Sequence, residues 1–136
     1  MALTVRKIIV WRGEVAHRPG ELARVLEALA HAGADLKVVM GYAEGARVIV
    51  EIAPITGRKQ IATARAVGLA ASTKPTLLVD GADRPGLGSK LAAAVAARGV
   101  SISFVVAQVV GRRFSAVFGF HSDQDARAAS AAIRLC

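Results

Sequence analysis

The sequence predicts an α+β fold in which one strand–helix–hairpin–helix unit is used twice. The 136-residue chain repeats itself at a constant spacing, because His-Arg-Pro-Gly at 17–20 recurs as Asp-Arg-Pro-Gly at 83–86. The spacing continues without a gap. Four later pairs of residues keep it: Val39 and Val105, Gly45 and Gly111, Arg47 and Arg113, Thr56 and Ser122. We therefore expect two units of one fold, divided as residues 1–73 and 74–136.

Each unit is expected to open with a strand that leads into a helix. Residues 9–15 alternate from Trp11 onward between apolar or small side chains and charged ones, as a half-buried strand does, and residues 75–81 are their counterpart. A proline should then take the first helical position, where its missing N–H is no loss, and a glycine should end the helix. The expected pairs are Pro19 with Gly33 and Pro85 with Gly99.

A hairpin and a second helix should follow in each copy. Apolar residues alternate in four further segments, which we expect to be strands: 35–40, 47–52, 102–106 and 114–120. Alanine-rich stretches at about 57–68 and 123–134 then predict helices. Thr56 and Ser122 stand where a side chain caps such a helix.

A closing strand is expected in only one copy. Residues 69–73 are available in the first copy, whereas no residue follows Cys136 in the second. Residues 3–8 have no role in the repeat and could pair at the vacant edge. Together the strands would form a sheet of eight or nearly eight strands, with the helices on one face.

Composition and charge exclude several classes of protein. No apolar run reaches 18 residues, so no membrane span or membrane partner is expected. The single cysteine, Cys136, allows no disulfide within one chain, which indicates a cytoplasmic protein. The net charge of +8 is divided evenly between the two halves. Dispersed charge, with phenylalanines expected to point inward, argues against nucleic acid as a partner.

The chain resembles the ACT domain family, whose members are small ferredoxin-like βαββαβ modules that bind amino acids and regulate metabolic enzymes. The resemblance rests on the strand that enters each [HD]-Arg-Pro-Gly turn, the helix that ends in glycine and the strand beginning two residues later. It covers nearly the whole chain in two copies. The resemblance implies two ferredoxin-like ACT units side by side, with antiparallel strands, helices on one face and no catalytic domain.

The resemblance also implies a ligand site at the junction of the two ACT units. Family members that bind an amino acid hold it with the turn before the first helix and with polar groups at the start of the second strand. The matching residues are His17, Arg18, Gly20 and Asp35 in the first copy, and Asp83, Arg84, Gly86 and Ser101 in the second. Binding members often carry Asn at the turn and strand positions, and this chain does not.

The chemistry of these turns points the same way without the family. Arg18 and Arg84 are poor helix caps, so the first N–H groups of each helix are open to a carboxylate. Gly20 and Gly86 have no Cβ that would keep a ligand from the backbone. Asp83 or Asp35 could accept a hydrogen bond from an ammonium group. The alternative is that the turns are only structural; the acidic Asp83 favours the second copy as the binding site.

The sequence offers no catalytic constellation, metal-ligand spacing or cofactor motif, so neither an enzyme nor a cofactor is expected. We predict a regulatory protein that binds a small amino acid and signals to a metabolic enzyme or regulator. The alternative is an assembly or regulatory subunit of a biosynthetic enzyme with no ligand of its own. Four apolar residues predicted on the helix-free sheet face also indicate a partner surface, either for a second copy of the chain in a homo-oligomer or for an enzyme: Val39, Ile49, Val105 and Val117.

Overall fold

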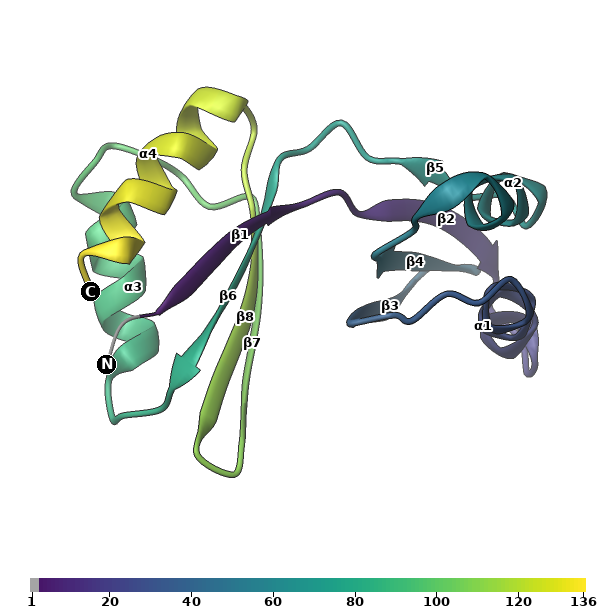
Figure 1. The fold of residues 1–136 in the computed structure, drawn as a ribbon, viewed down its shortest axis with the longest axis horizontal. Coiled ribbons are helices and arrows are strands. Elements are labelled where there is room, and N and C mark those ends of the chain that lie inside the picture. The colour runs from purple at the N-terminus through teal and green to yellow at the C-terminus, as the bar shows by residue number, and fades with distance from the viewer. Residues whose placement is uncertain (1–2) are drawn as a thin grey trace. The chain divides into compact units, whose positions relative to one another are not determined.

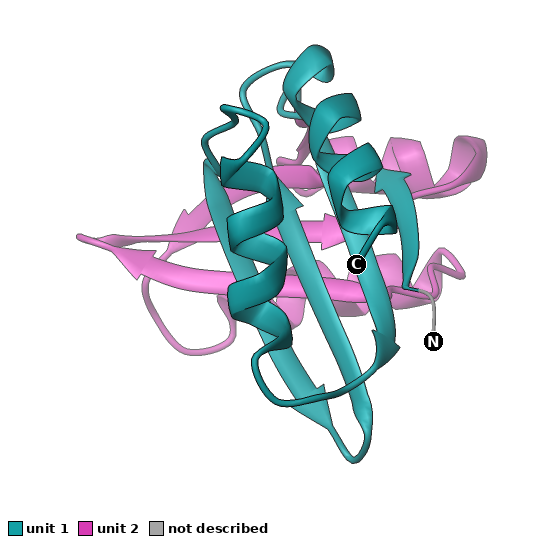
Figure 2. Ribbon diagram, turned by 90° about the vertical axis from the view of Figure 1, so that its left-hand side faces the viewer, with its two compact units in different colours: residues 1–8, 73–136 teal, residues 9–72 magenta. Residues whose placement is uncertain are grey.

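The computed structural model describes residues 3–136, and the chain forms two compact units. Unit 1 combines Met1–Ile8 with Thr73–Cys136, and unit 2 is Ile9–Ser72 (Figure 2). This division differs from the expected one, 1–73 and 74–136, mainly in where it assigns residues 1–8. The first strand of the chain belongs to the sheet of the second copy. None of the helices within residues 3–136 is long and apolar enough to cross a membrane.

Unit 2 contains one antiparallel sheet in the order β3-β4-β2-β5 and two helices (Figure 1). Its strands are β2 (Trp11–Ala16), β3 (Val38–Glu44), β4 (Arg47–Ala53) and β5 (Ala70–Ala71). Its helices are α1 (Glu21–His31) and α2 (Gly57–Ala66). The hairpin register pairs Glu44 with Arg47 across a tight turn in which Gly45 has a positive φ of 64°.

Unit 1 has the same topology, with its sheet in the order β1-β6-β8-β7. Its strands are β1 (Thr4–Ile8), β6 (Thr76–Ala82), β7 (Phe104–Val110) and β8 (Arg113–Gly119). Its helices are α3 (Leu87–Ala96) and α4 (Asp123–Arg134). The hairpin strands of the two units keep the spacing of the sequence repeat, since β7 and β8 begin at 104 and 113 and β3 and β4 at 38 and 47.

The vacant edge of the second copy is filled by β1, which confirms the prediction for residues 3–8. In unit 1, Lys7 of β1 pairs with Leu77 of β6. In unit 2, Ala71 of β5 pairs with Trp11, the residue equivalent to Leu77 in the repeat. β1 therefore takes the place that β5 has in unit 2. The prediction of one nearly eight-stranded sheet is wrong, because the hydrogen bonds form two four-stranded sheets. Each sheet is completed within its own unit, by β5 in unit 2 and by β1 in unit 1.

Each unit has its own hydrophobic core between its sheet and its two helices. In unit 2, Val25 and Leu29 of α1 and Ala64 of α2 pack against β2 and β4. In unit 1, Leu91 of α3 and Ile133 of α4 pack against β1, β6 and β8. The helices thus cover one face of each sheet, as predicted, and the fold is α+β.

The first helix of each unit begins at a different residue from the one predicted. Pro19 and Pro85 precede the helices, and the residues at the N-cap positions are Gly20 and Gly86, with φ of 90° and 80°. The prolines shape the turn instead, and a left-handed glycine then redirects the chain into the helix. Gly33 and Gly99, with φ of 83° and 70°, do follow the helix ends as predicted.

The second helices are capped differently in the two units. Ser122 Oγ accepts a hydrogen bond from the Asp125 N–H at 3.1 Å, which confirms the predicted cap. Thr56 makes no side-chain cap, so that prediction is wrong. The Gln60 side chain instead accepts a hydrogen bond from the Thr56 N–H at 2.8 Å, which stabilises the same helix start from inside the helix.

The predicted apolar patch on the helix-free face is right for Ile49 and Val117 and wrong for Val39 and Val105. Val39 lies opposite Ile52, and Val105 lies opposite Phe118. Both partners belong to the helix-side cores, so these two valines are on the helix side of the edge strands. Ile49 and Val117 are on the opposite face, which also carries two aromatic residues that the sequence analysis did not place there. They are Tyr42, opposite Ile49, and Phe104, opposite Gly119.

Candidate functional site

The turn between the first strand and helix of each unit is anchored to the hairpin loop of the same unit. The His17 N–H donates to the Ala46 carbonyl at 3.0 Å, and the Asp83 N–H donates to the Arg112 carbonyl at 2.8 Å. These bonds are equivalent in the repeat. They hold the predicted turn residues at one end of each sheet, next to the start of α1 or α3.

The first turn of each helix has no side-chain cap, as the sequence analysis predicted. Gly20 and Gly86 take its N-cap positions, and a Cβ on either glycine would meet no atom within 4 Å. Their positive φ therefore explains the glycines, whereas their predicted role in admitting a ligand stays a prediction. The uncapped N–H groups and the positive end of the helix dipole remain favourable for an anion.

A cavity of about 260 Å³ lies beside the turn of unit 2. Its walls are the end of β2, the turn residues His17 and Arg18, the first turn of α1 and residues 41–43 of β3. Val15 and Val48 contribute apolar surface. The cavity thus brings together two of the predicted site residues and two elements that the resemblance assigns to ligand binding, the turn and the second strand.

Glu21 gives this cavity a negative charge that the sequence analysis missed. Its carboxylate lies 3.5 Å from Arg18 Nε and 3.5 Å from Arg24 Nη2, and 19% of its side chain is exposed. The cavity wall therefore presents both signs of charge, from Glu21 and Arg18, next to apolar surface. An acidic residue directly after Arg-Pro-Gly was the signal that could have identified Glu21.

The strand that borders the cavity is an edge of its sheet. β3 pairs only with β4 in unit 2, so along residues 41–43 alternate N–H and C=O groups point away from the sheet. Such groups are free to hydrogen-bond an added segment or a ligand. The cavity can therefore offer backbone donors and acceptors as well as charged side chains.

Two predicted residues of the first copy do not line the cavity. Gly20 lies in the turn but is not part of the wall. Asp35 precedes β3, is 83% exposed in its side chain and pairs with Lys37 at 2.8 Å. The structure therefore groups His17 and Arg18 with Glu21 and not with Asp35.

The second copy has different residues at the same positions. Leu87 replaces Glu21 and Phe114 replaces Val48, and both side chains are buried, at 2% and 5% exposure. Asp83 and Ser101 are exposed, and Arg84 Nη2 donates to the Cys136 carbonyl at 3.0 Å. Leu87 and Phe114 thus stand in unit 1 at the positions whose equivalents in unit 2, Glu21 and Val48, line the cavity. The preference for the second copy as the binding site stays a prediction.

The described part of the chain holds no group of three or more His, Cys, Asp or Glu residues that could bind a metal ion. His17, His31 and His121 are all exposed, and His31 Nδ1 lies 3.0 Å from the Glu27 carbonyl of its own helix. The geometry of the candidate site is thus that of a binding site made from charged side chains, backbone groups and apolar surface.

Several solved structures share this fold, and regulatory subunits of aspartate kinase are among them. The regulatory subunit of aspartate kinase from Thermus thermophilus, in its ligand-free form, superimposes with a TM-score of 0.70 at 19% identity, over 99% of this chain and 96% of that chain. The fold is that of an aspartate kinase regulatory subunit. Protein BT0572 from Bacteroides thetaiotaomicron matches with a TM-score of 0.76 at 15% identity, over 91% of this chain and 87% of that one.

Whole aspartate kinases contain the regulatory-subunit fold as one part of a longer chain. Escherichia coli aspartokinase III in complex with lysine and aspartate matches with a TM-score of 0.58 at 12% identity, over 97% of this chain but only 32% of the enzyme. No protein-family model and no curated protein sequence matches this chain. The likeness therefore concerns the fold, and in extent the chain corresponds to the regulatory subunit.

Proposed function

We propose that this chain binds a small amino acid in the cavity of unit 2 and transmits its occupancy to a metabolic enzyme. The observation that supports this most directly is the cavity beside the uncapped start of α1, whose wall carries Glu21 and Arg18. An amino acid is a zwitterion and needs both charges matched within a few ångströms. The proposed role is regulatory and not catalytic.

The geometry suggests how the ligand lies in this proposal. Its ammonium group would donate to the Glu21 carboxylate. Its carboxylate would accept hydrogen bonds from Arg18 and from N–H groups in the first turn of α1, which no side chain caps. Its side chain would lie against Val15 and Val48. Arg18 would exchange part of its contact with Glu21 for the ligand carboxylate, so binding would change the turn that leads from β2 into α1.

The neighbouring structures support an amino acid as the ligand class. The aspartokinase III structure with the same fold contains lysine and aspartate and is described as the T-state.

A thermal-shift screen of the twenty amino acids tests the proposal. A ligand that binds only the folded state stabilises it by about 2.7 kcal/mol at a hundredfold excess over the dissociation constant, which shifts the melting temperature measurably. The proposal requires that at least one amino acid does so and that the corresponding D-amino acid does so less.

Two substitutions then locate the site by calorimetric titration of the ligand that the screen identifies. Val48→Phe copies the second unit and should abolish binding by filling the cavity, whereas Val39→Phe, on the same hairpin but outside the cavity, should not. Glu21→Gln should weaken binding by roughly tenfold or more, the loss expected for one charge-assisted contact.

The sequence-based preference for the second copy predicts a different result in the same titration. There, Asp83→Ala should weaken binding by about tenfold or more, and His17→Ala should cost less. Glu21→Gln should then have little effect. If only Asp83→Ala abolishes binding of the ligand, the site lies at Asp83, Gly86 and Ser101. That result would contradict the assignment to the cavity of unit 2.

A second candidate function is assembly without a ligand, and β7 is the observation that favours it. β7 is an edge strand of unit 1, carries no charged residue and exposes most of its length. Uncharged exposed edges pair readily with other strands. If no amino acid stabilises the protein but a stable oligomer forms, the assembly-subunit proposal is favoured over amino-acid sensing.

A further inference from the structure

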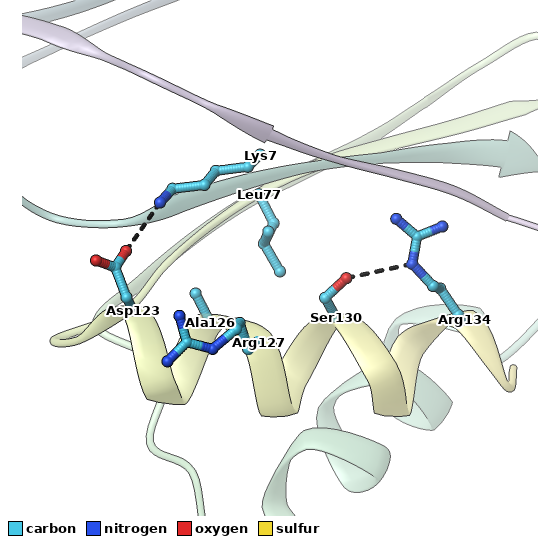
Figure 3. Close-up of a pocket in the computed structure, with 7 residues that line it drawn as sticks. All are labelled: Lys7, Leu77, Asp123, Ala126, Arg127, Ser130 and Arg134. Atoms are coloured by element: carbon cyan, nitrogen blue, oxygen red, sulfur yellow. Dashed lines mark hydrogen bonds and ion pairs between the residues drawn. The ribbon is translucent and has the colours of Figure 1, made fainter.

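A second cavity, of about 160 Å³, lies in unit 1 between β1 and α4 (Figure 3). It is unrelated to the turn sites. Its volume is about ten times the roughly 10–15 Å³ that a single water molecule needs. Leu77 and Ala126 form apolar wall, and the other lining side chains are polar or charged: Lys7, Asp123, Arg127, Ser130 and Arg134.

The two ends of this cavity are held in place by hydrogen bonds. At one end, Lys7 Nζ lies 2.9 Å from Asp123 Oδ1. At the other end, Arg134 donates from Nη2 to the Val5 carbonyl at 2.7 Å and from Nε to Ser130 Oγ at 3.3 Å. Figure 3 shows Lys7 and Asp123 reaching toward each other from β1 and α4.

Arg127 lies between these ends and has no hydrogen bond or ion pair with any residue that the structure describes. It follows Asp123 by four residues and precedes Arg134 by seven, so the three side chains lie along one face of α4. Together with Lys7 they give the cavity wall three positive charges and one negative charge. The wall therefore has a net charge of +2.

The repeat shows that these charges are not needed to build the fold. In unit 2, the spacing of the repeat places uncharged residues at all the equivalent helix positions, namely Gly57 for Asp123, Ile61 for Arg127, Ala64 for Ser130 and Gly68 for Arg134. The strand register likewise makes Ala71 the equivalent of Lys7. The same sheet and helices form without them, so the charged cavity is a property of unit 1 alone.

We propose that the cavity between β1 and α4 binds a phosphate group. A dianion would neutralise the wall, and guanidinium groups such as that of Arg127 match the oxygens of phosphate with paired N–H donors. Ser130 Oγ adds a neutral hydroxyl next to Arg134. Among the described residues Arg127 has no hydrogen bond or ion pair to give up and can close on the anion, and the exposed Lys7 side chain can turn from Asp123 toward it.

Calorimetric titration with methyl phosphate at pH 7.5, in constant ionic strength set by chloride, tests this proposal. Wild-type protein should bind it, and Arg127→Gln should weaken binding by roughly tenfold, the effect of one charge-assisted contact. Arg98→Gln removes the same charge from unit 1 outside the cavity and should leave binding unchanged. Equal losses in the two variants, or no binding to the wild type, would overturn the proposal.

Further titrations identify the chemistry that is recognised. If inorganic phosphate binds as tightly as methyl phosphate, the site recognises the free ion. If inorganic phosphate binds more weakly than methyl phosphate, the site recognises a phosphate ester. Because the second pKa of a phosphate monoester is about 6, lowering the pH from 7.5 to 5 should weaken binding as the dianion takes up a proton. Succinate that binds more tightly than both phosphates would contradict a phosphate site.

Discussion

Lys7 Nζ lies 2.9 Å from Asp123 Oδ1, although the two residues are 116 positions apart in the chain. The contact joins the strand that precedes unit 2 to the first residue of the helix that closes unit 1. The hydrogen bond from Lys7 and its positive charge lower the pKa of Asp123, and the charge of Arg127 contributes to a smaller extent. The pKa of Asp123 therefore shows whether β1 is paired with β6, because Lys7 lies on β1.

Replacing Lys7 should raise the pKa of Asp123. In Lys7→Gln the carboxylate loses its main partner, so its pKa should move toward the value of about 3.9 that is usual for Asp. A carboxyl-carbon NMR titration of Asp123 measures this. Lys90→Gln, on α3 and outside the cavity wall, should leave the titration unchanged; a shift of equal size there would show a general charge effect.

The same pair makes a contribution to stability that depends on pH. Because the pKa of Asp123 is lower in the folded state than in the unfolded state, the contribution is present above the unfolded pKa of about 3.9 and is lost as the pH falls through the folded pKa. The effect should be small because both side chains are largely exposed. The difference in denaturant midpoint between wild type and Lys7→Gln should narrow on acidification from pH 6 to pH 3.

A chain that begins at Ile9 should keep unit 2 folded and lose the structure of unit 1. Without β1 the edge of β6 is exposed, Val5 leaves the core and Arg134 loses its carbonyl partner. Amide hydrogen exchange should show protection in β2, β4 and α1 but not in β6 and β8. Appending residues 3–8 after Cys136 through a short Gly-Ser linker should restore unit 1, and failure to do so would contradict a purely local role for β1.

Gly13→Ala should destabilise unit 2. A Cβ at this position would lie 2.6 Å from Leu69 Cδ2 and 2.7 Å from the Gly68 carbonyl oxygen, and the latter is backbone that cannot move aside easily. We expect a loss of about 1–3 kcal/mol in the free energy of unfolding. Gly88→Ala, in the first turn of α3 where a Cβ meets nothing within 4 Å, should instead be neutral or stabilising.

Gly86→Ala should destabilise the protein through backbone conformation alone. Its φ of 80° costs an L-residue about 1–2 kcal/mol, although there is space for the Cβ. Gly86→Asn should cost less, because asparagine adopts the left-handed region more readily. Urea denaturation without ligand measures both; equal losses for Ala and Asn would point to a steric cause instead.

The exposed edge of unit 1 should make the protein self-associate through β7. Light scattering at micromolar concentrations should give a mass above the 14.1 kDa of one chain. Val106→Lys or Val109→Lys should lower the mass to that of one chain, because a charge on an edge strand opposes pairing. Thr4→Lys, on the already basic β1 edge, should not change it, and a monomeric wild type would contradict the prediction.

Much of the fold was predictable because the repeat allowed each element to be checked in a second copy. The partner of β1 could only be suggested, since sheet order depends on contacts between segments far apart in the chain, such as Lys7 with Leu77, that periodicity does not report. The helix starts were misplaced because proline and a left-handed glycine are both compatible with the turn. The faces of β3 and β7 were assigned wrongly because both residues of each alternating pair, such as Val105 and Val106, are apolar.

Less of the candidate site was predictable. The Arg-Pro-Gly turn identified the region, and His17 and Arg18 do line a cavity. Glu21 was missed because an acidic residue in a first helical turn is common for reasons of helix stability alone. Whether a cavity exists depends on side-chain volumes brought together from different elements, such as Val48 in one copy and Phe114 in the other, and a linear pattern does not show these.

The interruption of unit 1 by unit 2 fixes an order of events during synthesis. β1 is translated first, but its partner β6 follows only after residues 9–72, a delay of roughly 4–14 s at 5–20 residues per second. In that interval all of unit 2 has been made and can fold on the ribosome. Arg6 and Lys7 keep the waiting strand solvated, which lowers its tendency to pair with other nascent chains. The unit whose first strand is made earliest is therefore the last to be completed.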